Sequence, residues 1–121
     1  MLPAYKGLFP YIWATINDDQ IGISYHLVED DFDSGLILHQ IKDVPHKNRK
    51  TMIAFYIYVF RNFALDIQKA LNALVLKKSI QTSKNIKHSY FGLPNKADIK
   101  KFRKSGGKII SLADLFLALK L

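Results

Sequence analysis

Apolar and polar positions change their period several times in the first part of the chain. Pro10 stands where a first-turn proline would, and the apolar run after it stops at the polar residues 17–19, which predicts a short helix. Apolar residues then alternate with small or polar ones over 21–28, as in a strand with two different faces. An acidic turn over 29–35 precedes a second β-prone run over 36–41. We expect a helix followed by a strand, a loop and a strand.

The middle of the chain has a helical period. Apolar residues recur at steps of three and four, and Thr51 can cap the segment, so we expect one long helix over about 51–76. Residues 77–88 are polar and basic without a period, which predicts a loop that could include a short strand over 79–81.

Two short helices are predicted near the C-terminus. The first begins at Asn95 or Lys96, runs to about Arg103 and ends at the glycine pair that follows. The second covers 112–119, after a serine that can cap it.

Composition limits the class of protein. The chain has 121 residues, 49% of them apolar, which suits one compact domain or part of one. It has no cysteine, which excludes disulfides and cysteine-ligated metal sites. The most apolar run, 52–60, is far shorter than the ~20 residues of a membrane span. We expect a cytoplasmic protein without a signal peptide or a membrane partner.

Charge is distributed unevenly along the chain. Residues 1–47 hold three Lys/Arg against seven Asp/Glu, a net charge of −4, whereas residues 48–121 hold fifteen against three, a net charge of +12. Such asymmetry can indicate a nucleic-acid, phosphate or anionic-lipid partner, and it is also typical of a solvated basic surface. Both interpretations stay open at this point.

The acidic turn is the first candidate for chemistry. Four of the five residues from Glu29 to Asp33 are carboxylates. A calcium loop starting at Glu29 fails, because Ser34 stands where the turn glycine belongs and Gln40 where the bidentate glutamate belongs. We therefore expect no metal, and an ordinary acidic surface loop remains the alternative to a catalytic one.

Several spaced segments around this turn carry a resemblance to a known family. They are Leu2-Pro3-Ala4-Tyr5-Lys6-Gly7, Trp13-Ala14, Asn17-Asp18-Asp19, Gly22-Ile23 and Asp31-Phe32-Asp33-Ser34-Gly35. Their order resembles the second half of the formyltransferase catalytic domain, which reads roughly Leu-Leu-Pro-x-Tyr-x-Gly, Trp-Ala, Asn-Gly-Asp, Gly-Val-Thr and Leu-Asp-x-Gly. Residues 89–107 resemble a tail of some proteins with this domain. The likeness is strongest over 1–42.

The resemblance implies both a fold and a reaction. The fold would be α/β, the second half only of a doubly wound, Rossmann-like formyltransferase domain, with a strand-loop-strand unit, a long helix and a short helical tail. Residues 1–88 would form the half-domain and 89–121 the tail packing on it. The reaction would be formyl transfer from 10-formyltetrahydrofolate to a primary amine.

Site residues follow from the same resemblance. Asp33 would be the catalytic carboxylate, because an attacking amine must lose a proton while the folate nitrogen leaves. The backbone of Val28, Glu29, Asp30 and Asp31 would hold the pterin ring of the folate.

Two further residues would lie on the acceptor side. Gly7 would belong to the loop beside the cofactor and the acceptor, although a glycine in this motif could also merely shape a turn. His26 would line the site, and its alternative is an ordinary strand histidine satisfied by a backbone partner.

The resemblance also implies that the catalytic set is incomplete. The family's Asn-x-His-Pro-Ser segment, which donates hydrogen bonds to the oxyanion, would precede Met1. We expect an N-terminally truncated formyltransferase, inactive alone, that pairs with a complementary N-terminal fragment or forms a homo-oligomer. The acceptor would be a small-molecule amine such as an amino sugar nucleotide rather than a nucleic acid. The alternatives are a non-catalytic remnant and a basic module that binds RNA or phosphate.

Overall fold

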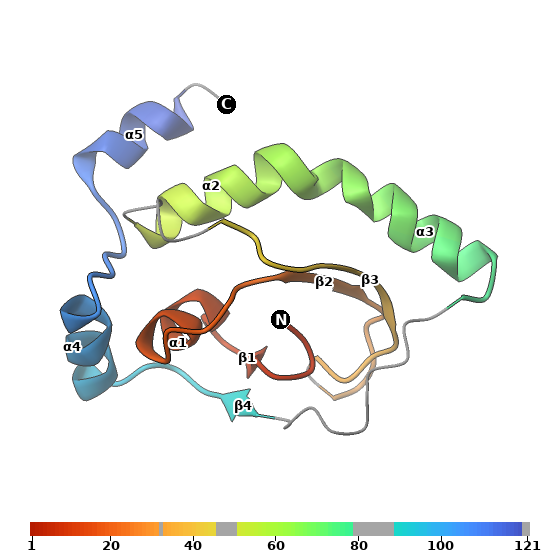
Figure 1. Ribbon diagram of the computed structural model, residues 1–121, viewed down its shortest axis with the longest axis horizontal. Coiled ribbons are helices and arrows are strands. Elements are labelled where there is room, and N and C mark those ends of the chain that lie inside the picture. The colour runs from red at the N-terminus through yellow and green to blue at the C-terminus, as the bar shows by residue number, and fades with distance from the viewer. Residues whose placement is uncertain (32, 46–50, 79–88, 120–121) are drawn as a thin grey trace.

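Two small sheets and five α-helices make up the described part of the chain. The computed structural model describes residues 1–31, 33–45, 51–78 and 89–119. A central hairpin lies beneath a long helical segment, and the C-terminal helices lie at one end (Figure 1). The structure is mixed α/β, as the sequence predicts.

The first sheet is the antiparallel hairpin of β2 (Ile23–His26) and β3 (Ile37–Ile41). Its register pairs Tyr25 with His39 but His26 with Ile37, so the ladder has an irregularity between Tyr25 and His26. The strand predicted over 21–28 is therefore real but shorter. The acidic turn connects the two strands, as expected.

The second sheet is parallel and was not predicted. It joins β1 (Lys6–Gly7) to β4 (Tyr90–Phe91), two segments from opposite ends of the chain. Strands of two residues carry no readable period, which explains why the sequence pattern missed them. The strand considered over 79–81 lies outside the described residues.

The helices follow the predicted order, with one difference. Helix α1 (Pro10–Ile16) begins at its proline. Helix α2 (Met52–Phe63) is capped by Thr51, whose hydroxyl accepts from the Ala54 amide at 3.0 Å. The predicted long helix is interrupted by a 3₁₀ turn, η1 (Ala64–Asp66), before α3 (Ile67–Val75).

The interruption coincides with a contact from the hairpin. The Tyr25 hydroxyl of β2 donates a hydrogen bond to the Phe63 carbonyl, the last residue of α2. A tertiary contact of this kind has no local sequence signal, because its two partners are far apart in the chain.

The C-terminal helices are α4 (Lys96–Lys104) and α5 (Leu112–Ala118). Both begin with a capping box, formed by Asn95 with Asp98 and by Ser111 with Asp114. The predicted bounds of both helices therefore agree with the structure to within a residue or two.

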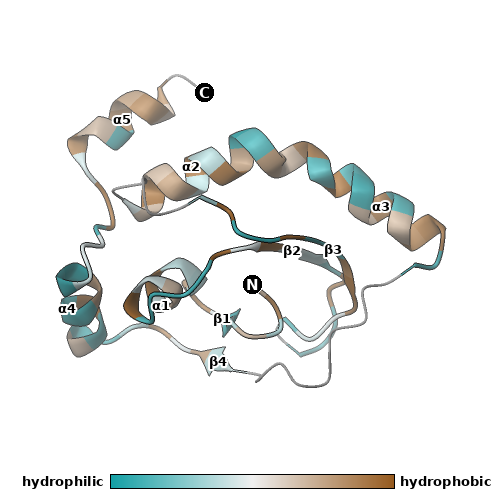
Figure 2. Cartoon of the chain, viewed as in Figure 1, coloured by the Kyte–Doolittle hydropathy of each residue, from teal (hydrophilic) through white to brown (hydrophobic). Residues whose placement is uncertain are grey.

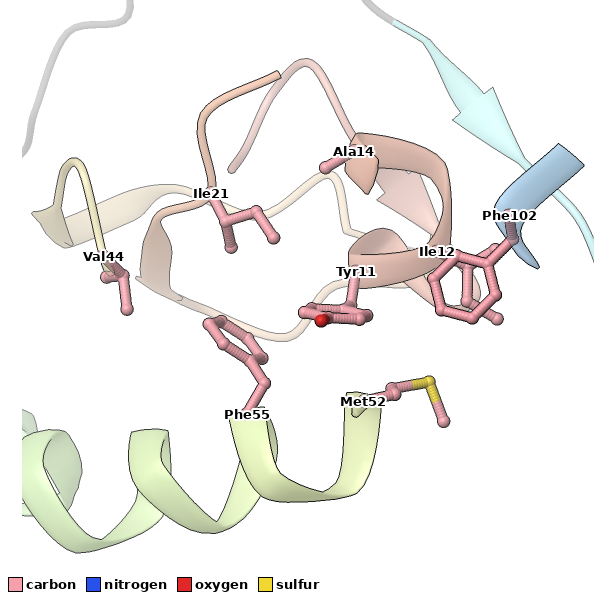
Figure 3. Close-up of a cluster of buried hydrophobic side chains, with 8 residues drawn as sticks. All are labelled: Tyr11, Ile12, Ala14, Ile21, Val44, Met52, Phe55 and Phe102. Carbon is pink, nitrogen blue, oxygen red and sulfur yellow. The ribbon is translucent and has the colours of Figure 1, made fainter. Parts of the chain in front are cut away.

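The core lies where α1, α2 and α4 meet. Tyr11 of α1 packs against Phe55 of α2 with ring centroids 4.8 Å apart, and edge-on against Phe102 of α4 at 6.1 Å (Figure 3). Phe102 is fully buried. The aromatic side chain of the C-terminal segment is thus part of the main core.

The surface of α4 is strongly polar, as its hydropathy colouring makes visible (Figure 2). Its basic side chains are exposed, whereas Ile99 and Phe102 face the core. In the described ranges, no helix is both long and apolar enough to cross a membrane. The doubly wound sheet and the boundary near residue 88 stay predictions.

Candidate active site

Asp33 lies in the loop between β2 and β3 and makes two contacts through its carboxylate. The Gly7 amide donates to Oδ2 at 2.7 Å, and His26 Nε2 lies 3.5 Å from Oδ1. The side chains of Asp33 and His26 are 32% and 22% exposed. The structure therefore brings together three residues that the sequence singled out, while leaving the carboxylate accessible to a ligand.

Backbone contacts and backbone conformation within the loop position Asp33. The Leu27 amide donates to the Leu36 carbonyl at 3.0 Å and closes its base. Gly35 sits directly against the Leu27 carbonyl, and a Cβ there would overlap that oxygen. Asp33 itself has φ 52°, a left-handed conformation that Asp adopts more readily than most residues. The Asp-Ser-Gly sequence thus fits the geometry of this loop.

The direction of the His26 side chain depends on the irregular register of the hairpin. A β-bulge re-aims a neighbouring side chain, and the register shift falls between Tyr25 and His26. His26 Nδ1 lies 2.8 Å from the Leu27 carbonyl, which only accepts hydrogen bonds, so Nδ1 carries a hydrogen. One ring nitrogen of His26 thus bonds the backbone, and the other faces Asp33.

This arrangement has an electrostatic consequence. With a hydrogen on Nδ1, a neutral ring would turn the lone pair of Nε2 toward the Asp33 carboxylate, which is repulsive. The contact is attractive when Nε2 also carries a proton, since the pair is then an imidazolium and a carboxylate.

A cavity of about 290 Å³ opens beside these residues. Gly7, His26 and Asp33 all line it. Its other walls are mostly apolar or aromatic and come from the N-terminal segment, α1, β2 and α2; they include Leu2, Tyr5, Tyr11, Ile23, Tyr56 and Phe60. A polar cluster on an apolar cavity is the usual form of a small-molecule site.

Tyr5 is a cavity residue that the sequence reasoning did not single out. Its hydroxyl donates to the Asp19 carboxylate and accepts from Asn17 Nδ2 at 3.1 Å. Burial, followed by the bond to Asp19, raises the pKa of Tyr5. Tyr5 belongs to the Leu-Pro-x-Tyr-x-Gly segment, so its place in the motif was the available signal.

Tyr56 of α2 is a second wall residue that was missed. Burial, and then the neighbouring Tyr11, raises the pKa of Tyr56. Its side chain therefore stays a neutral phenol at physiological pH. Only its apolar helical period could be read from the sequence, and a period does not distinguish a cavity wall from a core position.

The predicted folate residues occupy the outer part of the turn. Val28, Glu29, Asp30 and Asp31 are exposed and do not line the cavity. Among the described residues, the backbone groups of Val28, Glu29 and Asp30 form no hydrogen bond. The role of this part of the turn in binding a folate therefore stays a prediction.

No metal site accompanies the cluster in the part of the chain that the structure describes. Over these ranges, no group of three or more His, Asp or Glu side chains is arranged to hold a metal ion.

Solved structures with a similar fold include three sugar-related formyltransferases. The formyltransferase PseJ from Anoxybacillus kamchatkensis, in complex with UDP-4,6-dideoxy-4-formamido-L-AltNAc and tetrahydrofolate, has a TM-score of 0.62 at 23% identity, over 80% of this chain and 51% of that one. WlaRD, a sugar 3N-formyltransferase in the presence of dTDP and 5-N-formyl-THF, has a TM-score of 0.60 at 25% identity, over 75% and 34%.

The third is the N-formyltransferase from Helicobacter canadensis, in complex with folinic acid and dTDP-3-aminofucose. Its TM-score is 0.60 at 24% identity, over 80% of this chain and 35% of that one. No protein-family model and no curated protein matches the chain.

These likenesses define the class of structure: the described chain has a formyltransferase fold. More particularly, it is similar to the fold of sugar N-formyltransferases, and it spans 34–51% of the length of the solved chains. The alternative of a basic RNA- or phosphate-binding module is not favoured by this similarity.

Proposed function

We propose that this chain is part of a formyltransferase that moves a formyl group from 10-formyltetrahydrofolate to the primary amine of an amino sugar nucleotide. The observation that carries the proposal is the Asp33 carboxylate, held between the Gly7 amide and His26 at the wall of a cavity. The similar solved enzymes with folates and sugar nucleotides bound support it.

Asp33 acts as the proton acceptor. An amine that attacks a formyl carbon becomes positively charged and must lose a proton for the product amide to form. The Gly7 amide occupies one oxygen of Asp33 and thereby fixes the plane of the carboxylate. The exposed part of the carboxylate remains free to accept the proton.

His26 supplies the proton for the group that leaves. Its ring is fixed by the bond from Nδ1 to the Leu27 carbonyl, so Nε2 stays directed at Asp33. The doubly protonated ring gives its Nε2 proton to the departing group, and Asp33 then passes the proton taken from the amine back to Nε2. Gly7 therefore orients the carboxylate, and His26 shares its proton.

The turn 28–31 binds the folate. When bound, 10-formyltetrahydrofolate supplies a formyl group on a nitrogen that can leave. The free backbone groups of Val28, Glu29 and Asp30, together with Asp31, hold the pterin edge by hydrogen bonds. Recognition through the backbone would place no demand on the side chains of these residues.

The acceptor is a small molecule that enters the cavity near Gly7 and His26. Two of the similar solved enzymes carry UDP- or dTDP-linked amino sugar derivatives, which supports an amino sugar nucleotide as the acceptor. The mostly apolar walls contributed by Leu2, Tyr5 and Phe60 suit the non-reacting faces of a sugar ring.

A complementary polypeptide completes the site, either an N-terminal fragment or a second copy. The two-stranded hairpin β2–β3 gains stability when further strands extend it into a doubly wound sheet. Such a partner would also cover Phe60, which is 68% exposed at the cavity, and supply the oxyanion donors. In this scheme residues 1–88 form the half-domain and 89–121 its tail, and the chain alone is inactive.

The test measures formyl transfer with and without such a partner. The chain is assayed alone and co-purified with a polypeptide that carries the Asn-x-His-Pro-Ser segment, using 10-formyltetrahydrofolate and UDP- and dTDP-linked amino sugars. We expect a formamide product, detected by mass spectrometry, only in the presence of the partner. Absence of product with every partner and acceptor would refute the proposal.

A further inference from the structure

The short parallel pair β1–β4 lies directly behind the Asp33 contact. The Lys6 amide donates to the Ser89 carbonyl at 3.0 Å, and the Leu8 amide donates to the Phe91 carbonyl at 2.9 Å. Successive amides of a strand point in opposite directions, so the Gly7 amide between them must point away from β4. It points at Asp33 Oδ2, 2.7 Å away.

Aromatic stacking holds β4 in this position. The Phe91 ring is stacked on Tyr5, with centroids 5.2 Å apart and an interplanar angle of 13°. It is also stacked on Trp13, at 4.9 Å and 24°. Phe91 therefore ties the start of the chain and helix α1 to the tail, and such aromatic pairs add stability beyond the area that they bury.

Gly7 allows the two backbones to approach closely. It has φ 98°, and a Cβ at this position would overlap the Phe91 carbonyl oxygen. Phe91 is not among the residues that line the cavity, so it does not face a ligand there. Phe91 therefore acts on the site through its neighbours, the backbone of Gly7 and the ring of Tyr5, which lines the cavity.

We propose that Phe91 is a positioning residue, which fixes the Gly7 amide toward Asp33 and so sets the orientation of the catalytic carboxylate. The effect of Phe91 on catalysis rests on the proposed role of Asp33, whereas the effect of Phe91 on the Gly7 amide does not. The tail segment, which the sequence suggested only as packing, would then control the geometry of the site from a distance.

The structural part is tested by NMR on the full chain, without any ligand. The Gly7 amide signal should move when Asp33 is protonated, and this movement should vanish in Asp33→Asn. In Phe91→Ala we expect the Gly7 amide to exchange about tenfold faster, as loss of one hydrogen bond allows, and its response to pH to shrink. Phe91→Tyr, which keeps the ring, should restore both.

Two further variants distinguish a loss of the Gly7 orientation from a general loss of folded structure. Phe91→Leu keeps apolar volume but not the stacked ring, so it should show the Gly7 effect while the core amides of α1 keep their exchange rates. Leu93→Ala changes an exposed neighbour of the same segment and should behave like the unaltered chain. Unchanged Gly7 exchange and pH response in both Phe91→Ala and Phe91→Leu would overturn the proposal.

The kinetic consequence is measured separately in the partner-completed enzyme. We expect Phe91→Leu to lower kcat about tenfold because the carboxylate is misoriented, whereas a disturbed Tyr5 wall alone would raise KM and leave kcat unchanged. A Gly7 effect in the NMR experiment without any formyl transfer would reject the proposed function and retain the positioning role. An unchanged kcat in an active enzyme would reject the positioning role in catalysis.

Discussion

Asp33 illustrates how much of the site the sequence could predict at the scale of single residues. The spaced motifs singled out Gly7, His26 and Asp33, and the structure brings these three together. The sequence could not predict the directions of their groups. The direction of the His26 side chain depends on the irregular register of the hairpin. The direction of the Gly7 amide depends on the pairing of its neighbours, Lys6 and Leu8, with residues 89–91.

Tyr5 and Phe91 show the same limit. Tyr5 lies in the Leu-Pro-x-Tyr-x-Gly segment and Phe91 in the tail segment 89–107, but neither motif indicates that the two rings stack. Their stacking becomes visible only when both ends of the chain are placed side by side. The polar site residues could be predicted from the sequence, whereas the positions of the aromatic side chains could be known only from the fold.

A glycine exchange tests the close approach at β1. Gly7→Ala introduces a Cβ where the Phe91 carbonyl lies and places alanine at φ 98°, so we expect a loss of about 1–3 kcal/mol in the free energy of unfolding. Urea denaturation measures the loss.

Gly92→Ala is the matched control, because a Cβ there has no neighbouring atom within 4 Å. It should leave the unfolding free energy nearly unchanged. Equal stability of the two variants would contradict the described packing of β1 on β4.

At the scale of elements, the helices were predictable and the smallest strands were not. Helical period and capping residues gave the positions of α1, α2, α4 and α5, because both signals are local. The break at η1 coincides with a contact between distant segments, and the pair β1–β4 is itself such a contact. Tertiary contacts of this kind override or supplement local propensity.

The packing of α4 on α1 can be tested through Phe102. This side chain is fully buried beside Tyr11, so Phe102→Ala should lower the free energy of unfolding by about 3–5 kcal/mol. Lys100→Ala removes an exposed side chain of the same helix and should change it by less than about 0.5 kcal/mol.

Both changes are measured by urea denaturation. If Phe102→Ala were as mild as Lys100→Ala, α4 would not belong to the core that the structure describes.

At the scale of the whole molecule, the uneven charge has an ordinary explanation, and the fold was more predictable than the acceptor. The basic side chains of the second part include an exposed face of α4, which is the ordinary arrangement of a solvated amphipathic helix. The formyltransferase fold was predictable because its motifs lie in a fixed order along the chain. The acceptor was not, because its recognition depends on the combined walls of a cavity.

The most direct test of the central claim is the effect of Asp33→Asn on formyl transfer in the partner-completed protein. The amide keeps the shape of the side chain but cannot accept the amine proton, so we predict a fall in kcat of about two to four orders of magnitude. Thermal unfolding and folate binding should be unaltered. Unchanged turnover in this variant would contradict the role of Asp33 as the proton acceptor.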